Sequence, residues 1–163
     1  MVEVLFYHLE RDPLEKVLPQ LVEKSLARNW RCVIKGGSAE RLDAIDALLW
    51  TFREDSFLAH GKAGGPHDAR QPVLLTLSDQ VPNGAAVMFA VDGAELPDVR
   101  RFERTVYMFD GADAVAVDRA RTAWVEVRKR CAGLQAHDHR DNAVDITQTY
   151  WQQDSAGRWQ KRG

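Results

Sequence analysis

Two aspartates, Asp92 and Asp110, stand where metal-dependent chemistry could occur, because each follows an apolar run and precedes a glycine. If those runs are parallel strands, both carboxylates lie at the sheet edge where ligands bind, as in a metal-dependent phosphatase or nuclease. Such a site needs a third ligand, and the sequence offers none at a matching spacing. Asp-Gly pairs are also ordinary turn residues. We therefore expect turns at both positions and no catalytic residue.

Three further segments bear on phosphate, zinc and thiol chemistry. The Lys-Gly-Gly-Ser turn at residues 35–38 has neither dinucleotide-binding nor P-loop spacing, which favours a plain strand-to-helix turn over an anion site. The His-Asp-His segment at residues 137–139 lacks the paired spacing of zinc ligands. Cys32 lies in an apolar run, far from Cys131, as expected of a core thiol in a reducing compartment. The sequence thus predicts no metal, no cofactor and no enzyme.

Basic and aromatic residues concentrate late in the chain. Arg121, Trp124 and Arg128 are spaced by three and four residues, which places them on one face of a helix. Tyr150 and Trp151 add two aromatic rings further along. A basic rim around an aromatic pocket suits an acidic peptide that ends in an aromatic residue, and it also suits single-stranded nucleic acid. Composition alone favours a simpler interpretation, in which Trp124 packs on a sheet and the arginines are solvated.

A second aromatic group lies near the middle of the chain. Trp50, Phe52, Phe57 and Leu58 cluster where a predicted helix ends and a loop begins. Core packing would account for one or two of these side chains. Four large apolar groups at such a junction indicate a partner-binding patch.

The chain has 163 residues, of which 45% are hydrophobic and 28% charged, as in typical globular domains. Lys and Arg number 22 against 24 Asp and Glu, so the net charge of −2 restricts any nucleic-acid role to a local patch. The early acid Glu3, the missing basic leader and the absence of a long apolar run predict a cytoplasmic protein without membrane contact. We expect a single domain over residues 1–153 and a flexible tail over residues 154–163.

Helix-start signals occur at two places. Asp12, Pro13 and Glu15 predict a helix in which Asp12 is the cap and Pro13 the first helical residue. Ser38 predicts the cap of a second helix, which carries an apolar stripe to about Trp50.

Strand-like apolar runs alternate with the predicted helices. This order predicts an α/β fold, a three-layer sandwich with a mostly parallel, Rossmann-like central sheet. The expected strands cover residues 2–9, 30–35, 73–77, 86–91 and 105–109, further helices cover residues 96–104 and 113–129, residues 53–72 form a long loop and residues 131–148 a polar segment.

Short motifs spread in order over almost the whole chain resemble those of the chi subunit of bacterial DNA polymerase III. No single motif is specific, but the combination is. The motifs are Phe-Tyr-His-Leu at residues 6–9, the segment from Arg41-Leu42-Asp43 to Leu49-Trp50, Ser-Phe-x-x-His at 56–60, Val-Pro-Asn-Gly-Ala at 81–85, the helix from Ala120-Arg121 to Arg128, and Thr-Tyr-Trp-Gln-Gln-Asp at 149–154.

The resemblance implies a noncatalytic accessory protein of the clamp-loader complex. Members of this family link the clamp loader to single-stranded-DNA-binding protein by holding its acidic C-terminal tail, which ends in Pro-Phe, so that DNA is reached indirectly. By position, Arg121, Trp124 and Arg128 fall on the tail-binding helix of the family, and Tyr150 and Trp151 fall on its C-terminal segment. Guanidinium groups would pair with the carboxylates while the Phe ring enters an apolar pocket.

The resemblance also assigns a second surface. Trp50 and Phe57 match aromatic positions that contact the psi subunit, and the same surface is implied for a helicase. Without a psi subunit, these residues would contact the clamp loader itself. Val117 and Val125 stand where relatives can carry basic residues, which lowers the charge of the tail-binding face. Two other functions stay open: a nucleotide-binding or hydrolytic enzyme that uses the carboxyl edge of the sheet, and a direct single-stranded nucleic-acid-binding module.

Overall fold

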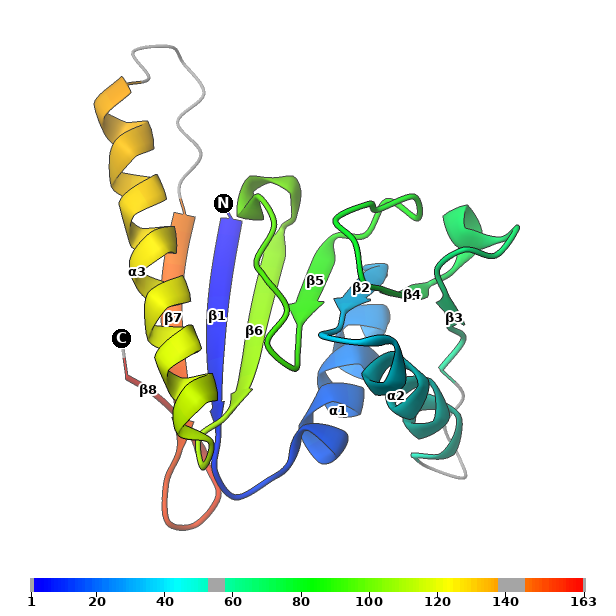
Figure 1. Ribbon diagram of the computed structural model, residues 1–163, viewed down its shortest axis with the longest axis horizontal. Coiled ribbons are helices and arrows are strands. Elements are labelled where there is room, and N and C mark those ends of the chain that lie inside the picture. The colour runs from blue at the N-terminus through cyan, green and yellow to red at the C-terminus, as the bar shows by residue number, and fades with distance from the viewer. Residues whose placement is uncertain (1, 53–57, 138–145, 163) are drawn as a thin grey trace.

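The computed structural model describes residues 2–52, 58–137 and 146–162, and Figure 1 presents it as a ribbon. Helices and strands alternate along most of the chain, as the sequence predicts. The strands are β1 (Val2–Leu9), β2 (Cys32–Lys35), β3 (Gly61–Lys62), β4 (Val73–Thr76), β5 (Val87–Ala90), β6 (Arg104–Asp110), β7 (Ile146–Gln153) and β8 (Trp159–Lys161), and the helices are α1 (Leu14–Ala27), α2 (Ala39–Thr51) and α3 (Ala114–His137).

The described strands form one eight-stranded sheet in the order β3-β4-β2-β5-β6-β1-β7-β8. All neighbouring strands are parallel except β7 and β8, which form an antiparallel pair. α3 lies in front of β7 and β1 in Figure 1, and α1 lies behind the sheet at β5 and β2. The predicted α/β fold, a three-layer sandwich with a mostly parallel sheet, is confirmed. No helix in the described part of the chain is long and apolar enough to span a bilayer.

Two crossovers leave the centre of the sheet in opposite directions. β1 continues through α1 to β2, while β6 continues through α3 to β7 on the other side of β1. Right-handed crossovers that run in opposite directions place their helices on opposite faces of a sheet. The point where the direction changes therefore lies between the carboxyl ends of β1 and β6.

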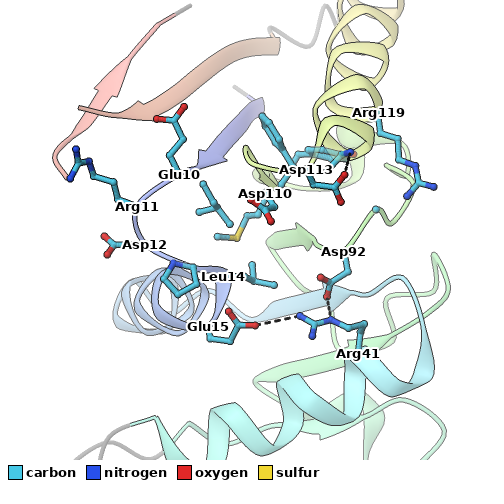
Figure 2. Close-up of a pocket in the computed structure, with 17 residues that line it drawn as sticks. Glu10, Arg11, Asp12, Leu14, Glu15, Arg41, Asp92, Asp110, Asp113 and Arg119 are labelled. Carbon is cyan, nitrogen blue, oxygen red and sulfur yellow. Dashed lines mark hydrogen bonds and ion pairs between the residues drawn. The ribbon is translucent and has the colours of Figure 1, made fainter. Parts of the chain in front are cut away.

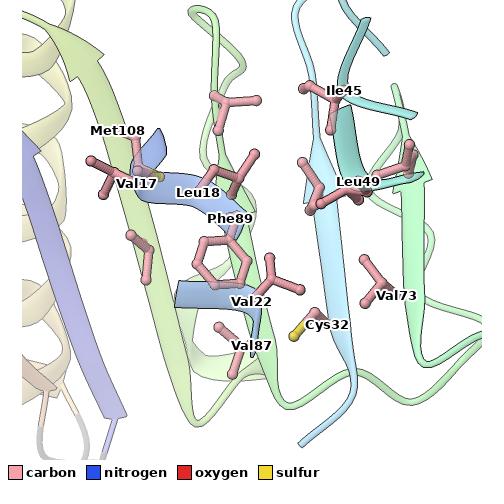
Figure 3. Close-up of a cluster of buried hydrophobic side chains, with 14 of the residues drawn as sticks. Val17, Leu18, Val22, Cys32, Ile45, Leu49, Val73, Val87, Phe89 and Met108 are labelled. Atoms are coloured by element: carbon pink, nitrogen blue, oxygen red, sulfur yellow. The ribbon is translucent and has the colours of Figure 1, made fainter. Parts of the chain in front are cut away.

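The larger core lies between the sheet and the α1 and α2 layer (Figure 3). Val17, Leu18 and Val22 of α1 are almost fully buried there, against Phe89 and other strand residues. Each such side chain contributes roughly 1.5–3 kcal/mol of burial free energy. Cys32 belongs to this core, and its burial raises the pKa of the thiol to about 12, which agrees with the predicted inert core cysteine.

The second core lies beneath α3. Val4 and Phe6 alternate along β1 with residues that face the other layer, because side chains of a strand point to opposite faces in turn. Ala120 and Val127 of α3 pack on them, together with Tyr107 of β6. This core is smaller than the first. One side of α3 packs in it against β1, β6 and β7.

One helix cap agrees with the prediction and one differs. Ser38 caps α2 by accepting a hydrogen bond from the Arg41 amide at 3.3 Å. The predicted Asp12 cap of α1 is wrong, since Pro13 has extended backbone angles and occupies the cap position without a side-chain bond. The reason is tertiary: Gln153 of β7 accepts hydrogen bonds from the Arg11 and Asp12 amides at 3.2 and 3.1 Å and donates to the Asp12 carboxylate at 2.8 Å.

Three segments expected to be irregular or helical differ from the prediction. The loop at residues 53–72 contains β3, which has two residues and pairs with β4, too short for alternation to reveal. The helix expected at residues 96–104 is a single 3-10 turn at Val99–Arg101. The described residues of the expected polar segment 131–148 belong to regular elements. α3 continues to His137, and β7 begins at Ile146.

The C-terminal segment 154–163, expected to be a flexible tail, contains β8. Asp154 closes the turn before it by accepting hydrogen bonds from the Ala156 and Arg158 amides, both at 2.9 Å. Gly157 supplies the positive φ of 79° that this turn requires. The ring of Trp159 then packs edge-on against Tyr7, with 5.0 Å between the ring centres. This aromatic contact and the pairing with β7 hold the segment on the sheet.

Candidate protein-binding surfaces

The helix face predicted to bind a peptide lies where α3 meets β7. The indole of Trp124 packs edge-on against Phe6 and Tyr150, with ring centres 5.1 and 5.9 Å apart. The side chain of Gln148 donates to the Trp124 carbonyl at 2.9 Å and ties the helix to β7. The structure therefore brings Tyr150 to the helix face. We call Arg121, Trp124, Val125, Arg128 and Tyr150 the α3 surface.

The rim of the α3 surface is basic and partly apolar. Arg121 keeps 78% of its side-chain area exposed, and its contact to Asp118 is a long 3.8 Å. Arg128 is exposed one turn beyond Trp124, and Val125 is 46% exposed between the two arginines. An exposed ion pair such as Arg121–Asp118 contributes little to stability. The guanidinium groups of Arg121 and Arg128 are therefore both available to a ligand. The surface thus offers two cations beside partly exposed apolar groups.

A hydrogen-bonded chain supports the aromatic floor of this surface. The Tyr150 hydroxyl lies 2.5 Å from His8 Nδ1, and His8 Nε2 lies 3.0 Å from a Glu10 carboxylate oxygen. Burial, followed by the nearby Glu10 charge, raises the pKa of Tyr150, while Arg121 opposes the shift. A Cβ at Gly111 would collide with the His8 ring, so this glycine allows the ring to lie where it does. The sequence reasoning missed His8 and Glu10, because only the pairing of β1 with β7 places them beside Tyr150.

Trp151 does not belong to the α3 surface, contrary to its grouping with Tyr150 in the sequence analysis. Neighbouring residues of a strand face opposite sides of the sheet. Tyr150 accordingly joins the α3 core, whereas the Trp151 ring stacks beside Tyr7 on the other face, with 6.4 Å between ring centres and 17° between planes. Two different surfaces therefore carry the two rings.

The second predicted patch separates into buried and exposed members. Leu58 is 3% exposed and Phe52 is half-buried against the larger core. Trp50 is 53% exposed at the end of α2, and its ring lies 4.7 Å from the ring of buried His60. Phe57 lies outside the described residues. Among the described members of the patch, Trp50 is thus the one that projects from the fold. We call the exposed ring of Trp50 at the end of α2 the Trp50 surface.

His60 provides a firm base for Trp50. Its Nδ1 lies 2.6 Å from the Leu58 carbonyl oxygen, and its Nε2 lies 3.0 Å from an Asp46 carboxylate oxygen. Its side chain is fully buried between these partners. A ring held at both nitrogens cannot rotate freely, so Trp50 packs against a fixed support. Exposed tryptophans are frequent anchors of protein interfaces.

A pocket of about 470 Å³ lies at the carboxyl edge of the sheet, where the two crossovers diverge (Figure 2). In many open α/β sheets this is where ligands bind. Here Arg41 spans the opening and contacts Asp92 at 3.0 Å and Glu15 at 3.5 Å. The hydrogen bond to Asp92 raises the pKa of Arg41. The guanidinium is therefore occupied by the protein's own carboxylates.

Two further acids at this edge, Asp110 and Asp113, accept hydrogen bonds from backbone amides. Asp110 accepts from the Ala112 amide at 2.9 Å within a turn. Asp113 caps α3 by accepting from the Val115 and Ala116 amides at 3.0 and 3.3 Å. Within the described residues, no three metal-ligating side chains gather into a cluster. The arrangement at this edge is thus that of turns and a helix cap, as expected for Asp92 and Asp110.

Comparisons with known proteins point to one family. The family model described as DNA polymerase III chi subunit, HolC, matches residues 1–137. A protein of Rickettsia prowazekii (strain Madrid E) named "Probable DNA polymerase III subunit chi" is 25% identical over 109 residues, which is 67% of this chain and 66% of that protein. The chain therefore matches slightly less than two thirds of that relative. The family match includes Arg121, Trp124 and Arg128 and ends before β7.

Proposed function

The chain belongs to the DNA polymerase III chi subunit family, and on that premise we propose that it is a cytoplasmic, noncatalytic accessory subunit of the clamp-loader complex. In this role it holds the acidic C-terminal tail of single-stranded-DNA-binding protein on the α3 surface. The observation that supports this most is the exposed pair Arg121 and Arg128 beside partly buried Trp124.

The chemistry of the α3 surface fits an acidic peptide with a terminal aromatic residue. Guanidinium groups form strong, geometrically specific hydrogen bonds with carboxylates, including a terminal one. The Phe ring of the tail would lie against Trp124 and the exposed side of Val125. Because the net charge of the chain is −2, the overall field does not attract an acidic peptide. Local attraction by Arg121 and Arg128 must therefore supply the affinity.

The Trp50 surface is the second docking site in this proposal. Its partner is the psi subunit or, without psi, the clamp loader itself, and a helicase would compete for the same position. Support comes from the 53% exposure of Trp50 and from its rigid base on His60. The two tryptophans stand on different helices, α2 and α3, so that both partners could be bound together.

Calorimetric titration with a synthetic acidic peptide ending in Pro-Phe tests the tail site. We expect Arg128→Glu to weaken binding about tenfold and to flatten its salt dependence, since a rim cation acts through long-range attraction. Removing the terminal Phe from the peptide should also weaken binding, because a buried aromatic contact slows dissociation. Arg70→Glu makes the same charge change on an exposed turn far along the sheet and should bind as the unmodified chain does. Equal affinity of the chain, Arg128→Glu and the shortened peptide would place the site elsewhere.

A further inference from the structure

Three aromatic rings gather on the face of the sheet opposite α3. Tyr7 of β1 and Trp151 of β7 are side by side in the register of the parallel pair, and Trp159 of β8 packs edge-on against Tyr7. Lys161 pairs directly with Trp151 across the hairpin, which places both side chains on the same face. We call Tyr7, Trp151, Trp159 and Lys161 the aromatic face.

This face is left open by the helix layer beside it. α1 packs on β2 and β6, and Figure 1 places it behind β5 and β2 rather than behind β7 and β8. Tyr7, Trp151 and Trp159 are accordingly only partly buried. A groove of about 240 Å³ runs between α1 and the sheet beside Tyr7. Large rings at an uncovered sheet face are unusual for surface residues and indicate a ligand.

The charge around the aromatic face is mainly positive. Lys24 and Arg28 of α1 line the groove, and both are exposed. Lys161 adds a third exposed cation at the opposite side of the rings. The fourth cation at the groove, Arg104, is paired with Glu3 at 2.7 Å and is neutralised. Within the described residues, Lys24, Arg28 and Lys161 form no ion pair. Two of these cations lie beside Tyr7 in the groove, and the third lies across the hairpin from Trp151.

We infer that the aromatic face binds single-stranded DNA directly. Bases stack on aromatic side chains, and phosphates pair with lysine and arginine along a groove, which is how strand-binding proteins without sequence preference work. Neighbouring strands hold the rings of Tyr7 and Trp151 side by side and nearly parallel, and the exposed parts of these rings offer π surfaces on which unpaired bases can stack. Because the chain belongs to a DNA polymerase III family, the expected nucleic acid is DNA. The inference goes beyond the proposed function, because the α3 surface lies on the other side of the sheet.

Fluorescence anisotropy with a labelled oligothymidine of about 16 nucleotides tests this contact. With three phosphate contacts, the logarithm of the affinity should fall with the logarithm of salt concentration at a slope of about −2. A duplex of equal length should bind about tenfold more weakly or worse, since its bases are not free to stack. Lys24→Glu combined with Lys161→Glu should abolish binding at moderate salt.

Two variants separate stacking from charge and from misfolding. Trp159→Leu keeps an apolar side chain but removes a stacking surface, and we expect a loss of about fivefold or more. Arg70→Glu, an equal charge change far from the aromatic face, should leave binding unchanged. Circular-dichroism melts identify any variant that fails to fold, and the double lysine variant concerns exposed side chains only.

Several results would overturn the inference. Equal binding of duplex and single strand would mean attraction by charge alone, and tighter binding of oligouridine would assign the face to RNA. Binding of the acidic Pro-Phe peptide that depends on Lys24 and Lys161 would make it a peptide site. Failure of the proposed tail site is recognised separately, because Arg128→Glu affects peptide titration and leaves the oligothymidine signal intact.

Discussion

Trp50 and Trp124 are both aromatic residues that the sequence marks as partner-binding, yet the fold uses them differently. Trp50 projects from the end of α2 and packs against the buried ring of His60. Trp124 is wedged between Phe6 and Tyr150 and joins the core beneath α3. A projecting ring can be removed without harm to the fold, whereas a wedged ring serves folding and binding together. Sequence spacing does not distinguish these cases, because burial depends on the element that lies opposite.

The supports of the two rings also differ. His60 is fixed by Leu58, two residues before it, and by Asp46 of α2. Tyr150 is fixed by His8, which is distant in the sequence and reaches it only through the pairing of β1 with β7. The α3 surface therefore depends on long-range assembly of the sheet, whereas the Trp50 surface depends on contacts between residues close together in the sequence.

The largest expected effect tests whether Trp124 is part of the core. Trp124→Ala should lower the free energy of unfolding by about 3 kcal/mol, because removal of the indole leaves a cavity beside Phe6 and Tyr150. Urea denaturation followed by circular dichroism measures the change. Val125→Ala, at the exposed neighbouring position, should stay within about 0.5 kcal/mol. Equal small effects of both variants would show that Trp124 is a surface residue like Trp50.

The next effect concerns Trp50. Trp50→Ala should change the free energy of unfolding by less than about 0.5 kcal/mol while it weakens clamp-loader or psi association by about 2 kcal/mol, close to thirtyfold. Surface plasmon resonance against the purified partner, with a melt of the same sample, measures both quantities. Arg70→Ala serves as the exposed control. A lost native melt in Trp50→Ala would mean that the two tryptophans do not differ, and the comparison would fail.

A smaller effect separates the support of Trp124 from its contact with ligand. Tyr150→Phe keeps the ring but leaves His8 without the hydroxyl partner, and we expect a loss of about 1 kcal/mol of stability. Affinity for the acidic peptide should change little, since the ring beneath Trp124 remains. Denaturation and calorimetry on one preparation decide the matter. A large loss of peptide affinity with intact stability would instead assign the hydroxyl to the ligand.

The smallest effect is a pH dependence on both faces of the sheet. Burial is the main cause that raises the pKa of Tyr7 on one face and of Tyr107 and Tyr150 on the other. A raised pKa means that the folded state holds the phenol proton more tightly than the unfolded chain does. Stability is then complete below about pH 10, the ordinary tyrosine pKa, and is lost as pH rises through the folded values.

Denaturation at stepped alkaline pH, with tyrosinate absorbance recorded in parallel, measures this loss. Tyr150→Phe should reduce the part that belongs to the α3 face and leave the part due to Tyr7. Stability that rises above pH 10, or tyrosines that ionise at their ordinary pKa in the folded protein, would contradict the expected burial.

Much of the architecture follows from local sequence. Apolar runs, helical spacing and the Ser38 cap predict the main strands, α1 and α2, and their order leads to the parallel three-layer fold. These signals are readable because each involves residues within a few positions of one another. β3, β7 and β8 escape prediction. β3 and β8 have two or three residues and carry no periodicity, while the mostly polar β7 becomes a strand through its pairing with the buried β1.

The candidate sites depend on both levels. Helical spacing correctly places Arg121, Trp124 and Arg128 along one side of α3, and period-two alternation explains why Tyr150 and Trp151 separate. The partners of each ring, by contrast, come from the position of β7 next to β1. Which strands become neighbours is settled by the total packing free energy of distant segments. The sequence by itself therefore determined the main helices, five of the strands, the family and the residue types at each surface, because these depend on neighbouring residues. Only the tertiary structure decided which short or polar segments join the sheet, which rings are wedged or project, and which face of the sheet they share.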